Sequence, residues 1–299
     1  MQAGLKENVV LPIEGSGRVL ARHDRRIGTI LAEQGKLAPR DIEGILKLQQ
    51  LRGMRFGEAA LRLRLITEMD LRRAVAKQYD LDHLLHGVEH ISSELVVARE
   101  PSHVRTEELR ALRTQLMIRW SNASPGQRAL VIASPGSGEG RSYIAANLAV
   151  AVSQLGERTL LIDADLRKPR QHLIFNIPDR AGLSAVLSGR ADRSAVAPVP
   201  GFGTLWLLPA GAPPPNPQEL LSRQNLAALL QELRGDFDVI LFDTPPAKRY
   251  ADVQSVAFRA GSALVLARKD HTRLDDATGV IRELSDTGAR VVGTVINAF

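Results

Sequence analysis

The chain has 299 residues, of which 44% are hydrophobic and 24% are charged, and it carries a formal net charge of +6. This length and composition predict a globular protein of two domains, and the basic excess suits polyphosphate ligands or an anionic membrane surface without arguing for DNA. The sequence contains no cysteine, which excludes disulfides, thiolate zinc sites and cysteine nucleophiles.

No apolar run approaches the roughly 18 residues needed to span a bilayer, and the first residues lack the apolar core of a signal peptide. We therefore expect a cytoplasmic protein and leave open a peripheral location at the inner membrane.

The first elements form a tandem repeat, in which residues 26–49 and 55–78 superimpose at an offset of 29 residues. Apolar residues recur at helical spacing in each copy, and Asp41 and Asp70 each place a negative charge in a first helical turn. Each copy predicts two short helices, and the pair predicts a small helical domain over residues 1–80.

Residues 81–103 lose this periodicity and contain Pro101, so we expect a linker there. The remainder, residues 104–299, alternates apolar strand-like runs with helical patterns. The expected strands are residues 130–134, 159–163, 204–208, 239–242, 263–267 and 291–296. Such alternation predicts an α/β domain with a mostly parallel sheet and helices on both faces.

A glycine-rich turn follows the first of these strands and precedes a helical run. Its members are Gly136, Ser137, Gly138, Glu139, Gly140, Arg141, Ser142 and Tyr143. This strand, loop and helix context is typical of a P-loop, where backbone N–H groups and the helix N-terminus bind phosphate. Ser142 is the expected hydroxyl ligand of Mg²⁺.

The turn departs from the usual P-loop pattern at two positions. Pro135 stands at the first glycine, and Arg141 stands at the lysine. Arginine keeps the positive charge but presents a planar fork on a longer stem, so the replacement changes the site.

Two of the strand-like runs end in an aspartate, Asp163 and Asp243. The carboxyl ends of parallel strands share one edge of the sheet, where ligands bind in open α/β folds. We therefore favour metal binding over helix capping for both carboxylates. Two interpretations of Asp165 stay open: it supports the catalytic carboxylate, or it only caps a helix.

These three runs together resemble the Walker motifs of bacterial tyrosine kinases (BY-kinases), a deviant Walker branch of the P-loop NTPases. Further family elements follow one another over residues 100–299. They are Glu107-x-x-Arg110-x-x-Arg113, Arg167-Lys168-Pro169, Gln171-His172 and Asn216-Pro217-Gln218-Glu219-Leu220-Leu221. The signature lysine of the related partitioning and septum-site ATPases is absent. The arginine-bearing turn is similar to that of the EpsG-type, chain-length-determinant-associated tyrosine kinases of exopolysaccharide export.

The resemblance implies ATP and Mg²⁺ as cofactors and phosphoryl transfer to protein tyrosine. It also implies roles for the acidic residues: Asp163 would activate the acceptor hydroxyl, Asp165 would support it, and Asp243 would hold the magnesium water shell. Arg141 would be the cation at the phosphates.

Two further residues are candidates for contact with the nucleotide. Arg167 either contacts phosphate or locks the loop after the second strand. Asn297, near the end of the last strand, either contacts the nucleotide base or forms an ordinary strand-end turn.

Partners follow from the same resemblance. The family uses its Glu-x-x-Arg-x-x-Arg motif between neighbours in a ring, so Glu107, Arg110 and Arg113 are an expected homo-oligomer interface, against the alternative of a solvated helical pair. A membrane polysaccharide co-polymerase is the expected partner, and no nucleic acid is expected. Family members usually end in a tyrosine-rich tail, whereas this sequence ends Val-Ile-Asn-Ala-Phe, so we expect the acceptor on another protein.

The N-terminal repeat resembles the MshE-type domain that binds cyclic di-GMP in pilus and secretion ATPases. The matching positions are Arg26, Gly28, Gly35, Gln49, Arg55, Gly57 and Gln78. Arg64 stands where the second copy should have its internal glycine, the residue that permits close approach of the backbone to a ligand. Cyclic di-GMP binding and docking of a partner both remain open for this domain.

Three activities remain open for the whole chain: a tyrosine kinase, a partitioning-type ATPase switch that modifies no protein, and a nucleotide-binding adaptor without turnover.

Overall fold

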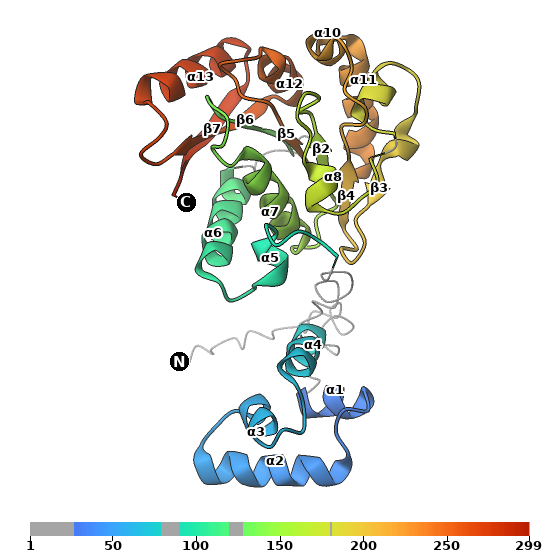
Figure 1. Cartoon of the computed structure of the whole chain (residues 1–299), viewed down its shortest axis with the longest axis vertical. Helices are drawn as coiled ribbons and strands as arrows, with labels where there is room; N and C mark the ends of the chain where they lie inside the picture. Colours follow the sequence, from blue (N-terminus) through green and yellow to red (C-terminus); the bar gives the residue numbers. More distant parts are fainter. Residues whose placement is uncertain (1–26, 79–89, 120–127, 180, 299) are drawn as a thin grey trace, which may run out of the picture. The chain divides into compact units, whose positions relative to one another are not determined.

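The computed structural model divides into two compact units, Met1–Leu85 and His86–Phe299, and describes residues 27–78, 90–119, 128–179 and 181–298 (Figure 1). Arg26, one of the expected cyclic di-GMP contacts, lies outside the described residues.

The described part of the first unit is helical. Its elements are α1 (Ile27–Glu33), α2 (Pro39–Arg52), α3 (Phe56–Arg62) and α4 (Glu68–Gln78). Helices α3 and α4 begin 29 residues after α1 and α2, the spacing of the sequence repeat. Asp41 accepts the N–H of Ala38 (2.8 Å), and Asp70 accepts the N–H of Thr67 (3.0 Å), so α2 and α4 begin with the same carboxylate cap.

An ion pair joins the two repeats, because Lys36 Nζ lies 2.9 Å from Asp70 Oδ1. The Thr67 hydroxyl also donates to Asp70 (2.6 Å). Together, the hydrogen bond from Thr67 and the contact with Lys36 lower the pKa of Asp70 to about 2.

Two of the repeat glycines serve helix packing within the unit. A Cβ on Gly28 would lie 2.9 Å from the Phe56 ring, and one on Gly57 would lie 2.6 Å from Leu71. Neither neighbour would leave room for a side chain without moving, so the close approach allowed by these glycines is between helices.

The internal glycine position has a different requirement. Gly35 has a φ of +69° and open space where its Cβ would be. Arg64, at the matching position of the second repeat, adopts the same left-handed conformation with a φ of 56°. The two repeats thus share a left-handed turn after their first helix, and the effect of Arg64 on ligand approach stays a prediction.

The second unit contains a seven-stranded sheet in the order β3-β4-β2-β5-β1-β6-β7. Its strands are β1 (Arg128–Ala133), β2 (Thr159–Asp163), β3 (Ala197–Pro198), β4 (Leu205–Leu208), β5 (Val239–Asp243), β6 (Ser262–Arg268) and β7 (Arg290–Asn297). All neighbours pair in parallel except β3, which is antiparallel to β4. The prediction of a mostly parallel α/β sheet is confirmed, and the short β3 was not predicted.

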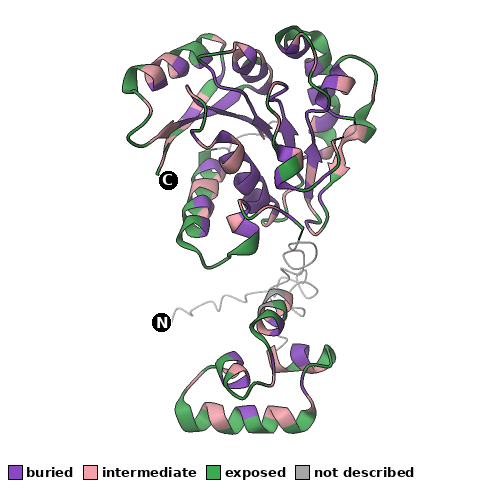
Figure 2. Ribbon diagram, in the orientation of Figure 1, coloured by how far each residue is buried: buried purple, intermediate pink, exposed green. Residues whose placement is uncertain are grey.

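Helices cover both faces of the sheet (Figures 1 and 2). One face carries α5 (Val96–Arg99), α6 (Val104–Arg119), α7 (Arg141–Ser153) and α8 (Gln171–Ile174). The other carries α9 (Leu183–Leu187), α10 (Pro217–Ser222), α11 (Gln224–Asp236), α12 (Asp252–Ala260) and α13 (Leu274–Asp286), with a 3-10 turn at Arg193–Ala195. Strand side chains alternate between two cores: Leu130 packs in the core with α7, and Val131 in the core with α12.

The predicted linker over residues 81–103 was wrong for its second half. Leu95 and Val97 are fully buried in the same core as α7. The N–H of Val97 donates to Asn147 Oδ1 (3.1 Å), and the N–H of Ser92 donates to Ile174 O (3.0 Å). The segment was missed because its irregular backbone has partners 50 or more positions away in the sequence, which periodicity does not reveal.

Among the described residues, no helix is long and apolar enough to cross a membrane.

Candidate functional site

The P-loop connects the buried end of β1 to the first turn of α7. Gly138 and Gly140 have φ values of 72° and 93°, which only glycine adopts easily. The loop lies at the C-terminal edge of the sheet, since β1 pairs in parallel with β5 and β6. Backbone N–H groups and the N-terminus of a thirteen-residue helix are therefore available to an anion at this edge.

The two strand-end aspartates lie side by side at the same edge. Asp163 and Asp243 are register partners on β2 and β5, and they are 0% and 1% exposed. Asp163 Oδ2 accepts the N–H groups of Arg170 and Gln171, both at 3.0 Å. Asp243 Oδ2 accepts the side-chain amide of Gln171 (2.8 Å), which also donates to Ser142 O (3.1 Å). Gln171 thus connects both carboxylates to the P-loop serine.

Burial decides the protonation of this pair. Desolvation, followed by the charge of Asp243, raises the pKa of Asp163 well above its ordinary value. Desolvation also raises the pKa of Asp243, although the hydrogen bond from Gln171, the nearby Ser142 hydroxyl and the charge of Arg141 oppose the rise. Two buried carboxylates facing one another favour a shared proton unless a cation is present.

Arg141 is buried inside the P-loop. Its Nε donates to Thr244 O (2.7 Å), and its Nη1 donates to Gly136 O (2.5 Å) and to the Ser134 hydroxyl. Burial lowers the pKa of the guanidinium, and the charge of Asp243 opposes that change. Arg141 therefore connects the P-loop to Thr244, the residue that follows β5, by a hydrogen bond.

Glu139 links the P-loop to the loop after β6. Its carboxylate accepts the N–H of Gly136 (2.6 Å) and the hydroxyl of Thr272, and its backbone carbonyl accepts the side-chain amide of Asn297 (3.3 Å). Glu139 is only 2% exposed. Sequence reasoning placed Glu139 in the loop but did not predict that its side chain fixes the loop's shape.

The oxygen groups at this edge fit a magnesium ion that is bound mainly through water and phosphate. The donor set is one hydroxyl and two carboxylates, and Asp243 Oδ1 is buried without a hydrogen-bond partner. Within the described ranges, no group of three or more His, Cys, Asp or Glu side chains could hold a metal ion. The site is therefore suited to an ion that arrives with the nucleotide.

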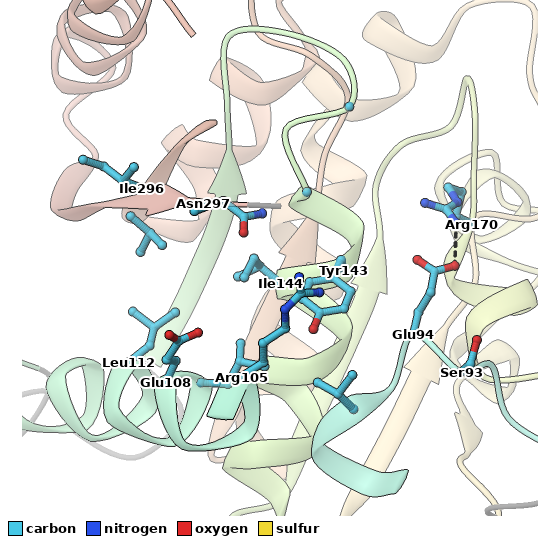
Figure 3. Close-up of a pocket in the computed structure, with 16 residues that line it drawn as sticks. Ser93, Glu94, Arg105, Glu108, Leu112, Tyr143, Ile144, Arg170, Ile296 and Asn297 are labelled. Carbon is cyan, nitrogen blue, oxygen red and sulfur yellow. Dashed lines mark hydrogen bonds and ion pairs between the residues drawn. The ribbon is translucent and has the colours of Figure 1, made fainter. Parts of the chain in front are cut away.

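A cavity of about 710 Å³ opens beside the P-loop (Figure 3). Gly138 and Gly140 line it from the loop, Tyr143 from α7, Arg105 from α6 and Asn297 from β7. Burial raises the pKa of Tyr143, and Arg105 opposes the rise. The cavity adjoins the P-loop glycines and is large enough to admit a nucleoside.

Asp165 and Arg167 stabilise the loop after β2. Asp165 Oδ1 accepts the N–H groups of Arg167 (3.2 Å) and Lys168 (2.9 Å), which is the geometry of a cap. The Arg167 guanidinium makes two bonds to the buried Asp252, at 2.8 and 3.0 Å, and lies 3.9 Å from the centroid of the Tyr250 ring. This arrangement matches the locking alternative for Arg167, and the alternative of a phosphate contact stays a prediction.

The three motif residues of α6 do not share one exposed face. Arg110 pairs with Glu107 (2.5 Å) and donates to Pro101 O (3.0 Å). Arg113 donates to Ala151 O of α7 (3.0 Å) within its own chain. Arg113 therefore supports the contact between α6 and α7, and its place in a subunit interface stays a prediction.

Gln171 is the functional residue that sequence reasoning missed, having quoted it only as a family element. Its position directly after the charged loop that follows β2 was the available signal. Its partners, however, lie 29 and 72 residues away.

The chain is similar to several known proteins. Residues 128–278 match the family of the cellulose biosynthesis protein BcsQ. The putative tyrosine-protein kinase CapB of Staphylococcus aureus is 33% identical over 205 residues, which are 69% of this chain and 89% of CapB. The putative tyrosine-protein kinase EpsB of Ralstonia solanacearum is 35% identical over 208 residues, which are 69% of this chain but 27% of EpsB.

A solved structure shows the same likeness. The kinase domain of the Escherichia coli tyrosine kinase ETK superimposes with a TM-score of 0.66 at 28% identity, covering 70% of this chain and 81% of that domain. The P-loop, the two strand-end aspartates and these relatives identify the same group of enzymes. The chain belongs to the bacterial tyrosine-protein kinase family.

Proposed function

We propose that this chain is a Mg-ATP-dependent kinase that phosphorylates protein tyrosine in an exopolysaccharide polymerisation and export system. The observation that carries the proposal is the junction at Gln171, whose side-chain amide donates to Ser142 O and Asp243 and whose backbone N–H donates to Asp163. Phosphoryl transfer depends mostly on positioning and charge neutralisation, which a P-loop, a cation and two carboxylates provide.

Each residue has a role in this proposal. Ser142, Asp163 and Asp243 would hold Mg²⁺, which supplies neutralisation of phosphate charge when it is bound. Asp163 accepts the proton of the acceptor hydroxyl as the general base. Arg141 provides the positive charge at the phosphates, with backbone N–H groups of residues 138–142 around it.

The cavity beside the loop is the proposed site of the nucleotide base. Asn297 lines it and is held by Glu139 O, so its remaining amide oxygen is available to a base. This assignment places the phosphates at Gly138 and Gly140, the cavity's boundary with the P-loop.

The proposed partners come from the family resemblance. A membrane polysaccharide co-polymerase would bring the chain to the cytoplasmic face of the inner membrane, and the basic excess of the chain suits that surface. Glu107, Arg110 and Arg113 remain the candidates for a subunit interface, since Glu107 is 66% exposed at its side chain.

The first unit is proposed to bind cyclic di-GMP or, alternatively, to dock a partner. Arg55 is exposed, Gly35 has open space around it, and Gln49 and Gln78 are partly exposed. Calorimetry with cyclic di-GMP on the full chain tests this, beside Arg64→Gly, which restores the glycine of the resembled motif. Binding by neither protein assigns the unit to docking.

Transfer of radiolabel from ATP tests the kinase. We expect labelled phosphotyrosine on a poly(Glu,Tyr) substrate or on a co-polymerase, and no label with Asp163→Asn. Release of phosphate to water without any protein label would instead support the partitioning-type switch.

One observation bears on the adaptor alternative. The buried guanidinium of Arg141 already donates through Nε and Nη1 to Thr244, Gly136 and Ser134, which leaves its Nη2 group for contact with phosphate. Nucleotide binding with neither label transfer nor phosphate release would favour the adaptor.

A further inference from the structure

Gln171 lies at the centre of the site, at the first position of α8, and is fully buried. Its side-chain Nε2 donates to Asp243 Oδ2 at 2.8 Å and to Ser142 O at 3.1 Å, while its backbone N–H donates to Asp163 Oδ2 at 3.0 Å. One residue therefore contacts β2, β5 and the first turn of α7.

The amide has only one favourable orientation. Both neighbours of Nε2, a carboxylate oxygen and a backbone carbonyl, are acceptors, so a rotated amide would face them with its own oxygen. In the observed orientation Gln171 Oε1 is buried and has no hydrogen-bond partner. The second oxygen of Asp243 is buried and unpartnered in the same way.

Two buried acceptors without donors are costly, and such atoms in native proteins point to a ligand or ordered water. Water bound to a metal ion can only donate hydrogen bonds, so it would supply the donors that these two acceptors lack. The other oxygen of Asp243, Oδ2, already accepts the amide of Gln171, so Oδ1 is the oxygen that lacks a donor.

We propose that Gln171 is a positioning residue for the hydrated magnesium ion. It fixes the rotation of the Asp243 carboxylate, so that Oδ1 of Asp243 and its own Oε1 accept hydrogen bonds from water bound to the ion. This inference rests on the proposed Mg-nucleotide site and adds a residue to which no role was assigned.

The test measures ADP binding to the full chain with and without Mg²⁺. Gln171→Met keeps the length of the side chain and removes the amide. We expect little change in the dissociation constant of ADP without Mg²⁺, and a loss on the order of 10-fold in the affinity gained when Mg²⁺ is added. Equal weakening with and without Mg²⁺, or no change, would overturn the inference, because a merely structural role does not depend on the ion.

A double-mutant cycle checks that Gln171 acts through Asp243. In an Asp243→Asn background, Gln171→Met should cause little further loss of the Mg²⁺ effect, whereas two independent losses that add would contradict the proposal. Leu173→Met is the matched control, since Leu173 lies on the same short helix and is 65% exposed. It should leave both dissociation constants unchanged.

If Gln171→Met does not fold, Gln171→Asn is measured in the same way, because its amide is one methylene too short to reach both acceptors. Failure of the proposed function can be told apart from failure of this inference. If the parent protein does not bind Mg-ADP, the proposed nucleotide site itself is wrong. If the parent protein binds Mg-ADP and the variants keep the full Mg²⁺ effect, only the role proposed for Gln171 is wrong.

Discussion

Asp163 lies directly opposite Asp243 on adjacent parallel strands, and both carboxylates are almost completely removed from solvent. Such a pair is unfavourable when both groups are ionised and no cation is bound. The fold accepts this cost at the edge where the P-loop ends, which is common for sites that bind a charged ligand.

Asp163→Asn should stabilise the ligand-free protein while abolishing turnover. The pKa of Asp163 in the folded protein is raised above its unfolded value of 3.8. The protonated carboxyl group therefore makes its full contribution to the stability of the fold below pH 3.8, and this contribution is lost as the pH rises through the folded pKa. Removing the charge should therefore raise the free energy of unfolding at pH 7 by about 0.5–2 kcal/mol, with a smaller gain toward pH 4. Urea unfolding across this pH range measures it.

The control for this prediction is Asp192→Asn. Asp192 is exposed and its pKa is lowered by hydrogen bonds from Ser194, so its replacement should give no gain in the free energy of unfolding at neutral pH.

Turnover should fall by roughly 100-fold or more in the Asp163 variant, as expected for loss of a general base. An unchanged rate would exclude Asp163 from the chemistry.

Arg141→Lys should retain turnover within about tenfold of the parent, because lysine keeps the charge at the phosphates. It should also lower stability by roughly 1.5–3 kcal/mol, the usual contribution of a hydrogen bond to a charged group, since lysine cannot keep the bond to Thr244 O together with those to Ser134 and Gly136. ATPase assays and thermal unfolding separate the two effects. Arg141→Met, which lacks the charge, should lose turnover, and an active methionine variant would contradict the role of the cation.

Asn297→Ala should weaken ATP binding about fivefold, the effect of losing one net hydrogen bond. The KM for ATP should rise with kcat little changed, because the base is remote from the reacting phosphate. Thr294→Ala is the matched control on the same strand, as Thr294 is exposed and does not line the cavity. Equal effects of the two changes would place the base elsewhere.

Gly57→Ala should destabilise the first unit by about 1–3 kcal/mol, because its Cβ would come 2.6 Å from Leu71. Gly44→Ala is the matched control in α2, where a Cβ meets nothing within 4 Å, and should stabilise the unit by roughly 0.5–1 kcal/mol. Amide hydrogen exchange of the full chain reports both changes in α1–α4. If Gly57→Ala leaves the stability of the unit unchanged, α3 and α4 can move apart at no cost in free energy.

Local patterns in the sequence were enough to predict most elements of the fold. The glycine-rich turn between an apolar strand and a helix predicted the P-loop, and the runs ending at Asp163 and Asp243 predicted two strand ends at one edge of the sheet. The offset of 29 residues between repeats predicted the order of the four helices. These predictions succeeded because helical and strand periodicity, and the backbone freedom of glycine, act within a few residues along the chain.

Only the tertiary structure decided which partners the polar side chains have. It turned Arg113 toward Ala151, paired Arg167 with Asp252, and placed the amide of Gln171 between Ser142 and Asp243. It also buried Leu95 in a segment without periodicity. A hydrogen bond needs its two groups within about 3 Å, and for residues far apart in sequence that distance is fixed by strand order and helix packing rather than by any local pattern.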